Sequence, residues 1–74
     1  MIEVKLFAGL RQGREKAYEF PVDKFERVEE IGEYLEIPRE KMAIILINGV
    51  HSELDATFKD GDVISIFPAV GGGC

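Results

Sequence analysis

The sequence has few of the residues on which several protein classes depend. It contains one cysteine, Cys74, so an internal disulfide cannot form. Its one histidine, His51, has no cysteine or histidine neighbours at metal-ligand spacing, so we expect a solvated side chain and no metal site. The chain has nine basic and fourteen acidic residues, and its net charge of −5 makes it a poor match for nucleic acid.

Other familiar patterns are also missing. No signal-peptide pattern precedes the first expected strand, and no apolar run approaches membrane-spanning length, so we expect a cytoplasmic protein without a membrane partner. There is no nucleophile elbow and no phosphate-binding glycine loop before a helix. A chain of 74 residues has room for one domain and one core but not for a deep catalytic pocket. We therefore expect a non-catalytic protein without a bound cofactor.

Apolar periodicity predicts two strands and a helix in the first half of the chain. Residues 2–6 alternate between apolar and charged side chains, as in a half-buried strand, and residues 16–20 can return antiparallel to them until Pro21. A helix is expected over residues 24–36, with Asp23 as its N-cap and Glu26 as the capping-box partner. Its core-facing residues recur at helical spacing: Phe25, Val28, Ile31 and Leu35.

Acidic side chains lie on the opposite side of the expected helix. They are Glu26, Glu29, Glu30 and Glu33. We interpret them as a solvated face. The net acidic charge favours a partner with a basic surface, because opposite charges speed encounter. An ordinary soluble surface explains the same charge equally well.

The second half of the chain predicts three more strands. Residues 43–47 form an inner strand, Asn48-Gly49 is a strong hairpin signal, and residues 50–54 form a short edge strand. A turn at residues 60–62 precedes the last strand, residues 63–67. The order predicts an α+β fold in which one helix crosses one face of a mixed sheet of four to five strands. Residues 1–68 would form the domain and 69–74 a flexible glycine-rich tail.

Strand alternation also predicts an apolar patch on the face opposite the helix. Phe7, Leu46 and Phe67 point to that face if their neighbours point to the core. If the first and last strands lie side by side in the middle of the sheet, the patch surrounds the exit of the tail, with Arg11 at its rim. Such aromatic anchors are typical of binding surfaces. The alternative is a minor core covered by the loop over residues 9–14.

Several segments resemble one known family. The opening Val4-Lys5-Leu6-Phe7-Ala8, with Leu10-Arg11 after it, resembles the start of the small subunit of molybdopterin synthase. The MoaD/ThiS sulfur carriers are similar at Ile47-Asn48-Gly49, Leu54, Asp60-Gly61-Asp62-Val63, Ile66-Phe67-Pro68 and Val70 before a glycine run. The resemblance covers essentially the whole chain and is nearer to the molybdopterin branch than to the thiamin branch. It implies a β-grasp, ubiquitin-like fold.

The resemblance also implies a use for the tail Gly71-Gly72-Gly73. In the family the last glycine of a pair carries the reactive carboxylate, which corresponds to Gly73 here. A ubiquitin-activating-type enzyme adenylates this carboxylate with ATP and Mg, and a sulfur donor converts it to a thiocarboxylate. The carrier then hands the sulfur to a small-molecule precursor inside a larger partner, either molybdopterin synthase large subunit or thiazole synthase. Partner-binding positions would be Phe7, Arg11, Leu46, Phe67, Pro68 and Val70.

Cys74 departs from the simple family pattern, because Gly73 is held in a peptide bond as long as Cys74 follows it. A protease can remove Cys74, its thiol can itself handle sulfur, or the residue is incidental. Two other functions stay open for the whole chain. Activated Gly73 could modify lysines of other proteins, or the domain could be an interaction module with an inert tail.

Overall fold

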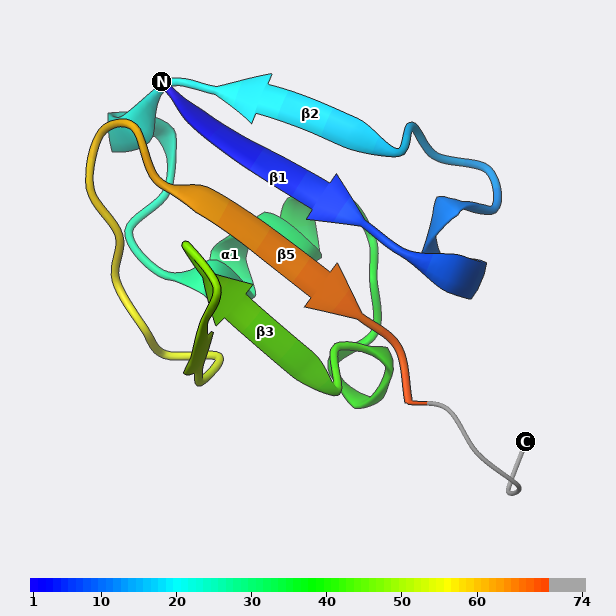
Figure 1. Cartoon of the computed structure of the whole chain (residues 1–74). Coiled ribbons are helices and arrows are strands. Elements are labelled where there is room, and N and C mark those ends of the chain that lie inside the picture. Colours follow the sequence, from blue (N-terminus) through cyan, green and yellow to red (C-terminus); the bar gives the residue numbers. More distant parts are fainter. Residues whose placement is uncertain (70–74) are drawn as a thin grey trace.

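A computed structural model describes residues 1–69, so the predicted tail, apart from Ala69, lies outside the described residues. These residues form five strands, one α-helix and three short 3₁₀ helices (Figure 1). The strands are β1 (Ile2–Leu6), β2 (Ala17–Phe20), β3 (Ile44–Ile47), β4 (Val50–Ser52) and β5 (Val63–Phe67). The helices are η1 (Ala8–Arg11), η2 (Val22–Lys24), α1 (Val28–Tyr34) and η3 (Arg39–Lys41).

The strands form one mixed sheet in the order β2-β1-β5-β3-β4. β1 and β5 run parallel, with Val4 opposite Ile64, and the other neighbouring strands are antiparallel. Figure 1 shows β5 in the middle of the sheet, between β1 and β3. The first and last strands therefore lie side by side, which was the condition for the expected position of the apolar patch. The predicted mixed sheet with one main helix is confirmed.

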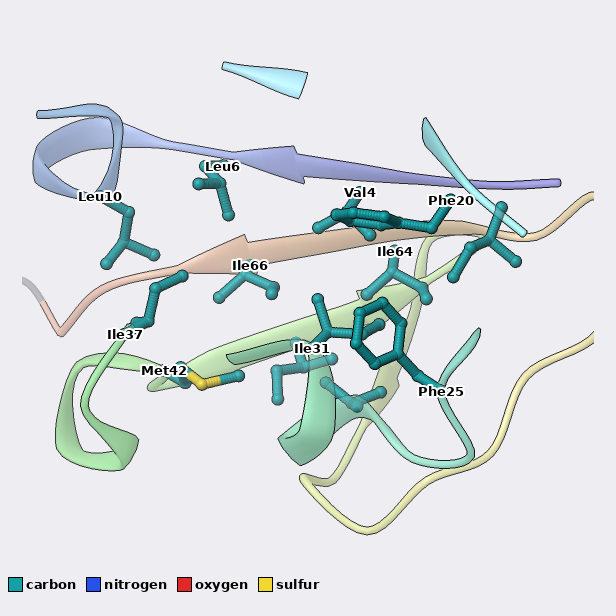
Figure 2. Close-up of a cluster of buried hydrophobic side chains, with 13 residues drawn as sticks. Val4, Leu6, Leu10, Phe20, Phe25, Ile31, Ile37, Met42, Ile64 and Ile66 are labelled. Carbon is teal, nitrogen blue, oxygen red and sulfur yellow. The ribbon is translucent and has the colours of Figure 1, made fainter. Parts of the chain in front are cut away.

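The core lies between α1 and one face of the sheet. Each central strand buries alternate side chains. Leu6 of β1 is the register partner of Ile66 of β5, and Ile66 is also the register partner of Ile45 of β3. Val28 and Ile31 of α1 complete this layer, and neither has exposed surface. Figure 2 shows Ile31 close to the side chains of the sheet. Full burial of an aliphatic side chain stabilises the fold by about 1.5–3 kcal/mol, so these central positions dominate the free energy of folding.

The helix starts later than the sequence predicts. α1 begins at Val28, with Arg27 as its N-cap, and the expected capping box of Asp23 and Glu26 does not form. The Val28 and Glu29 N–H groups instead donate to the carbonyls of Ala56 and Leu54, at 3.1 and 2.9 Å. A loop far along the chain therefore satisfies the free amides of the first turn, and no capping side chain is needed there.

The helix also ends early, at Tyr34 instead of Glu36. Glu36 has a φ of 61°, and the Ile37 N–H donates to the Gly32 carbonyl at 2.8 Å, which is the pattern of a Schellman motif. The Arg14 guanidinium then donates to the carbonyls of Leu35 and Glu36 at 3.0 and 2.9 Å. These bonds fasten the loop after β1 to the end of α1.

The β3–β4 hairpin has the turn that its sequence predicts. Asn48 and Gly49 both have positive φ, 53° and 81°, as a two-residue type I′ turn requires. β4 ends at Ser52 instead of Leu54, because the chain then leaves the sheet to cap α1. The loop expected over residues 9–13 contains the 3₁₀ helix η1. No helix in the described part of the chain is long and apolar enough to cross a membrane.

Candidate functional site

The candidate site lies where β5 ends. β5 stops at Phe67, and Pro68 and Ala69 lead toward the glycine residues that lie outside the described range. Because β5 is central, this exit is flanked by η1, which follows β1, and by η3, which precedes β3 (Figure 1). A pocket of about 350 Å³ opens beside it, lined by Gly9, Gln12, Glu40, Lys41, Pro68 and Ala69.

An apolar patch lies on the sheet face opposite α1. We call it the open-face patch, and it consists of Phe7, Ile44, Leu46 and Phe67. The rings of Phe7 and Phe67 are stacked, with centroids 4.3 Å apart and planes inclined by 10°. Ile44 is the register partner of Phe67 and is 40% exposed, while Leu46 is half-buried on the same strand. Strands β1, β5 and β3 thus bring together four apolar side chains beside the tail exit.

Arg11 covers one end of this patch. Its guanidinium carbon lies 5.4 Å from the centroid of the Phe7 ring, and its Nε donates to the Leu6 carbonyl at 2.8 Å. The loop itself does not bury the patch, because Leu10 turns into the main core instead. The structure places Arg11 over Phe7 at the edge of the patch, and Phe7, Leu46 and Phe67 are half-buried. Partner binding by these residues stays a prediction.

Two features of the site were not predicted from the sequence. Ile44 was missed, although it shares the alternation of Leu46 and lies two residues before it. The pocket was missed because it unites η1 and η3, which are about thirty residues apart, and nothing local indicates their contact. Pro68 is half-buried and lines this pocket. The predicted roles of Val70 and of residues 71–74 concern positions outside the described range.

The opposite end of β5 is held by two side chains. The Asn48 amide accepts from the Val63 N–H and donates to Asp62, both at 2.9 Å. Asp62 also accepts from the Lys59 N–H at 2.8 Å. This backbone hydrogen bond, with the Asn48 amide and the Lys59 charge, holds the pKa of the Asp62 carboxyl below its ordinary value. The network fixes the start of the strand that leads to the tail.

His51 is exposed on β4, opposite Leu46 in the register. No group of three or more His, Cys, Asp or Glu side chains suited to a metal ion occurs among residues 1–69.

A five-stranded β-grasp sheet with its C-terminal strand at the centre defines a small ubiquitin-like carrier domain. The chain belongs to the ThiS family, whose model matches residues 4–73. This finding covers nearly the whole sequence and confirms the family resemblance. ThiS-family members are small carrier proteins. No curated protein matches the chain significantly.

Solved structures of similar proteins share this fold over their full length. A chain of the BexX/CysO complex from Amycolatopsis orientalis is 28% identical, with a TM-score of 0.68, and the match covers 99% of this chain and 100% of that one. A chain of the complex between subunits 1 and 2 of molybdopterin-converting factor from Helicobacter pylori is 26% identical, with a TM-score of 0.61 and 97% coverage of both chains. Both relatives were solved in complex with a partner subunit.

SAMP1 from Haloferax volcanii is another similar structure. It is 24% identical, with a TM-score of 0.71 over 97% of this chain and 98% of that one. At this identity the likeness concerns the fold alone.

Proposed function

We propose that this chain is a sulfur carrier that delivers sulfur from a thiocarboxylate on Gly73. The observation that carries the proposal is the end of the family match, at Gly73, one residue before Cys74. This match supports Gly73 as the counterpart of the family's terminal glycine, and in this proposal Cys74 is removed before activation. The central exit of β5 and the open-face patch beside it suit an enzyme that grips the domain while it acts on the tail.

The chemistry needs two steps once hydrolysis of the Gly73–Cys74 peptide bond has freed the carboxylate. In an adenylating enzyme with ATP and Mg, a carboxylate oxygen attacks the α-phosphorus and pyrophosphate leaves. A sulfur nucleophile at the oxidation level of sulfide then attacks the acyl carbon, and AMP leaves with the bonding electron pair. Glycine suits this position because it has no Cβ to hinder passage through a narrow channel or attack on the acyl carbon.

For the acceptor, we propose a molybdopterin-type cofactor precursor held by a large-subunit partner. The similarity to a chain of the molybdopterin-converting factor complex supports this choice over the thiamin route. In this role the chain is a co-substrate that is consumed and regenerated.

The test compares three chains with the adenylating enzyme encoded in the same genome: residues 1–73, the full chain, and residues 1–72 as a control one residue short. We expect ATP–pyrophosphate exchange with residues 1–73. With the other two chains we expect exchange at least about 100-fold slower, because a misplaced carboxylate cannot reach the α-phosphorus. With a sulfur donor present, intact mass should show one oxygen replaced by sulfur. No exchange with residues 1–73, or Gly73 linked to lysines without thiocarboxylate, would contradict the proposal.

A further inference from the structure

Arg11 is held in place on two sides. Its guanidinium lies over the Phe7 ring, and its Nε donates to the Leu6 carbonyl. The two terminal nitrogens, Nη1 and Nη2, make no hydrogen bond within residues 1–69. The ion pairs of this part of the chain, Met1–Asp60 and Arg39–Glu29, do not involve Arg11. The planar guanidinium group of Arg11 is thus fixed in orientation and still has N–H donors for a planar acceptor such as a carboxylate.

Two basic side chains, Arg11 and Lys5, lie beside the open-face patch, although the chain as a whole is acidic. Lys5 lies on the same face of β1 as Phe7, two residues earlier, and is exposed. Glu3 and Glu19 are acidic side chains of this face, and they oppose each other in the register at the end of the sheet away from the tail exit. Glu40 lines the pocket beside that exit, next to Lys41. The helical glutamates belong to the other side of the molecule. A basic partner, as the net charge indicates, therefore does not suit this face.

We infer that Arg11 binds a carboxylate of the adenylating enzyme, so that the enzyme surface covering the open-face patch is apolar at its centre and acidic at its edge. The inference rests on the proposed function and adds the chemistry of the partner surface. An arginine that is already oriented loses little conformational entropy on binding, and arginine beside stacked aromatic rings is a frequent hot spot. Lys5 adds to the attraction without contacting the same group.

The test measures binding of full-chain variants to the adenylating enzyme by surface plasmon resonance at several salt concentrations. R11Q is expected to weaken binding by about 30-fold, and R11K to recover only part of this loss because an ammonium group cannot form a bidentate pair. K5Q should slow association and reduce its salt dependence with a smaller effect on dissociation. R27Q is the matched control: it removes the same charge at the exposed N-cap of α1, and its affinity should stay within about twofold of the unmodified chain.

Circular dichroism would check that each variant is folded, and K5Q tests the charge without touching the packing of Phe7. The inference is wrong if R11Q and K5Q bind as tightly as R27Q while an Ile44→Asp variant, which disrupts the apolar centre, loses binding. If residues 1–73 neither bind the enzyme nor support pyrophosphate exchange, the proposed function is contradicted, and the inference with it.

Discussion

At the scale of single residues, Asn48 connects the tip of the β3–β4 hairpin to the start of β5. Its backbone N–H donates to the Val63 carbonyl at 2.8 Å, and its side-chain oxygen accepts from the Val63 N–H. Its side-chain nitrogen reaches Asp62. Asparagine tolerates the left-handed backbone here and supplies both a donor and an acceptor. Aspartate in its place would lose the donor and set two carboxylates against each other.

The Asp62 carboxyl should make stability depend on pH. Because its pKa is lowered in the folded chain, Asp62 contributes stability above its unfolded pKa and loses it as pH falls through the folded pKa. We expect the free energy of unfolding of an Asp62→Asn variant to fall less than that of the unmodified chain between about pH 5 and pH 2. Urea unfolding at a series of pH values measures this difference.

Asp55→Asn is the matched control, since the Asp55 side chain is exposed and makes no hydrogen bond within residues 1–69. Its pH profile should follow that of the unmodified chain. If Asp62→Asn also follows it, the Asp62 network contributes nothing to acid stability.

Alternation along single strands predicted three of the four residues of the open-face patch. It placed Phe7, Leu46 and Phe67 on that face, and the structure brings Phe7 and Phe67 into a stack. The Asn48–Asp62 bond joins residues fourteen positions apart, so no local pattern could indicate it. Side-chain networks of this kind depend on tertiary structure, and single-sequence patterns therefore do not predict them.

At the scale of elements, the helix shows where local patterns fail. Its apolar spacing predicted the correct core residues, Val28 and Ile31, but too long a helix. Phe25 is buried before the helix begins, as part of an aromatic cluster in which its ring meets that of Phe20 edge-on. Helix bounds are decided here by carbonyls of a distant loop and by Arg14, and neither is visible in the periodicity.

Near the end of α1, we expect substitution by glycine to change the free energy of unfolding in opposite directions at two glutamates. Glu36 has the left-handed conformation that glycine adopts without strain, and its charge lies near the negative end of the helix dipole. Glu36→Gly should therefore raise the free energy of unfolding by about 0.5–1 kcal/mol. The same change at Glu33, inside α1, should lower it by about 1 kcal/mol. Both values follow from thermal or urea unfolding, and equal effects at the two sites would contradict this account of the helix end.

At the scale of the whole molecule, the proposed function places recognition and reaction in separate parts of the chain. The buried core and the open-face patch lie within residues 1–69, while the proposed reactive carboxylate belongs to Gly73. The order of elements along the chain and the mixed sheet with one main helix were predictable from the sequence and the family resemblance. The pocket beside the exit was not, because it depends on how η1 and η3 meet around Pro68.

This separation predicts that residues 1–69 fold and bind without reacting. Because the patch would supply most of the binding energy, the truncated chain should compete with the full chain for the adenylating enzyme with an affinity at most about tenfold weaker. It should support no pyrophosphate exchange. An Ile44→Asp substitution in the same truncated chain should weaken its affinity for the enzyme by at least about a further tenfold, because binding would bury an unpaired charge. Equal competition by the two would show that recognition does not use the patch.

The parallel pairing of β1 and β5 has a mechanical consequence. β1 begins at the N-terminus and β5 leads to the C-terminus, and their register pairs run from Glu3–Val63 to Leu6–Ile66. A force that pulls the two ends apart acts along both strands in opposite directions, so the hydrogen bonds between them must break together under shear. Bonds that break together resist force better than bonds that open one at a time. A partner that holds this carrier by its tail and pulls would therefore meet a domain that stays folded under tension.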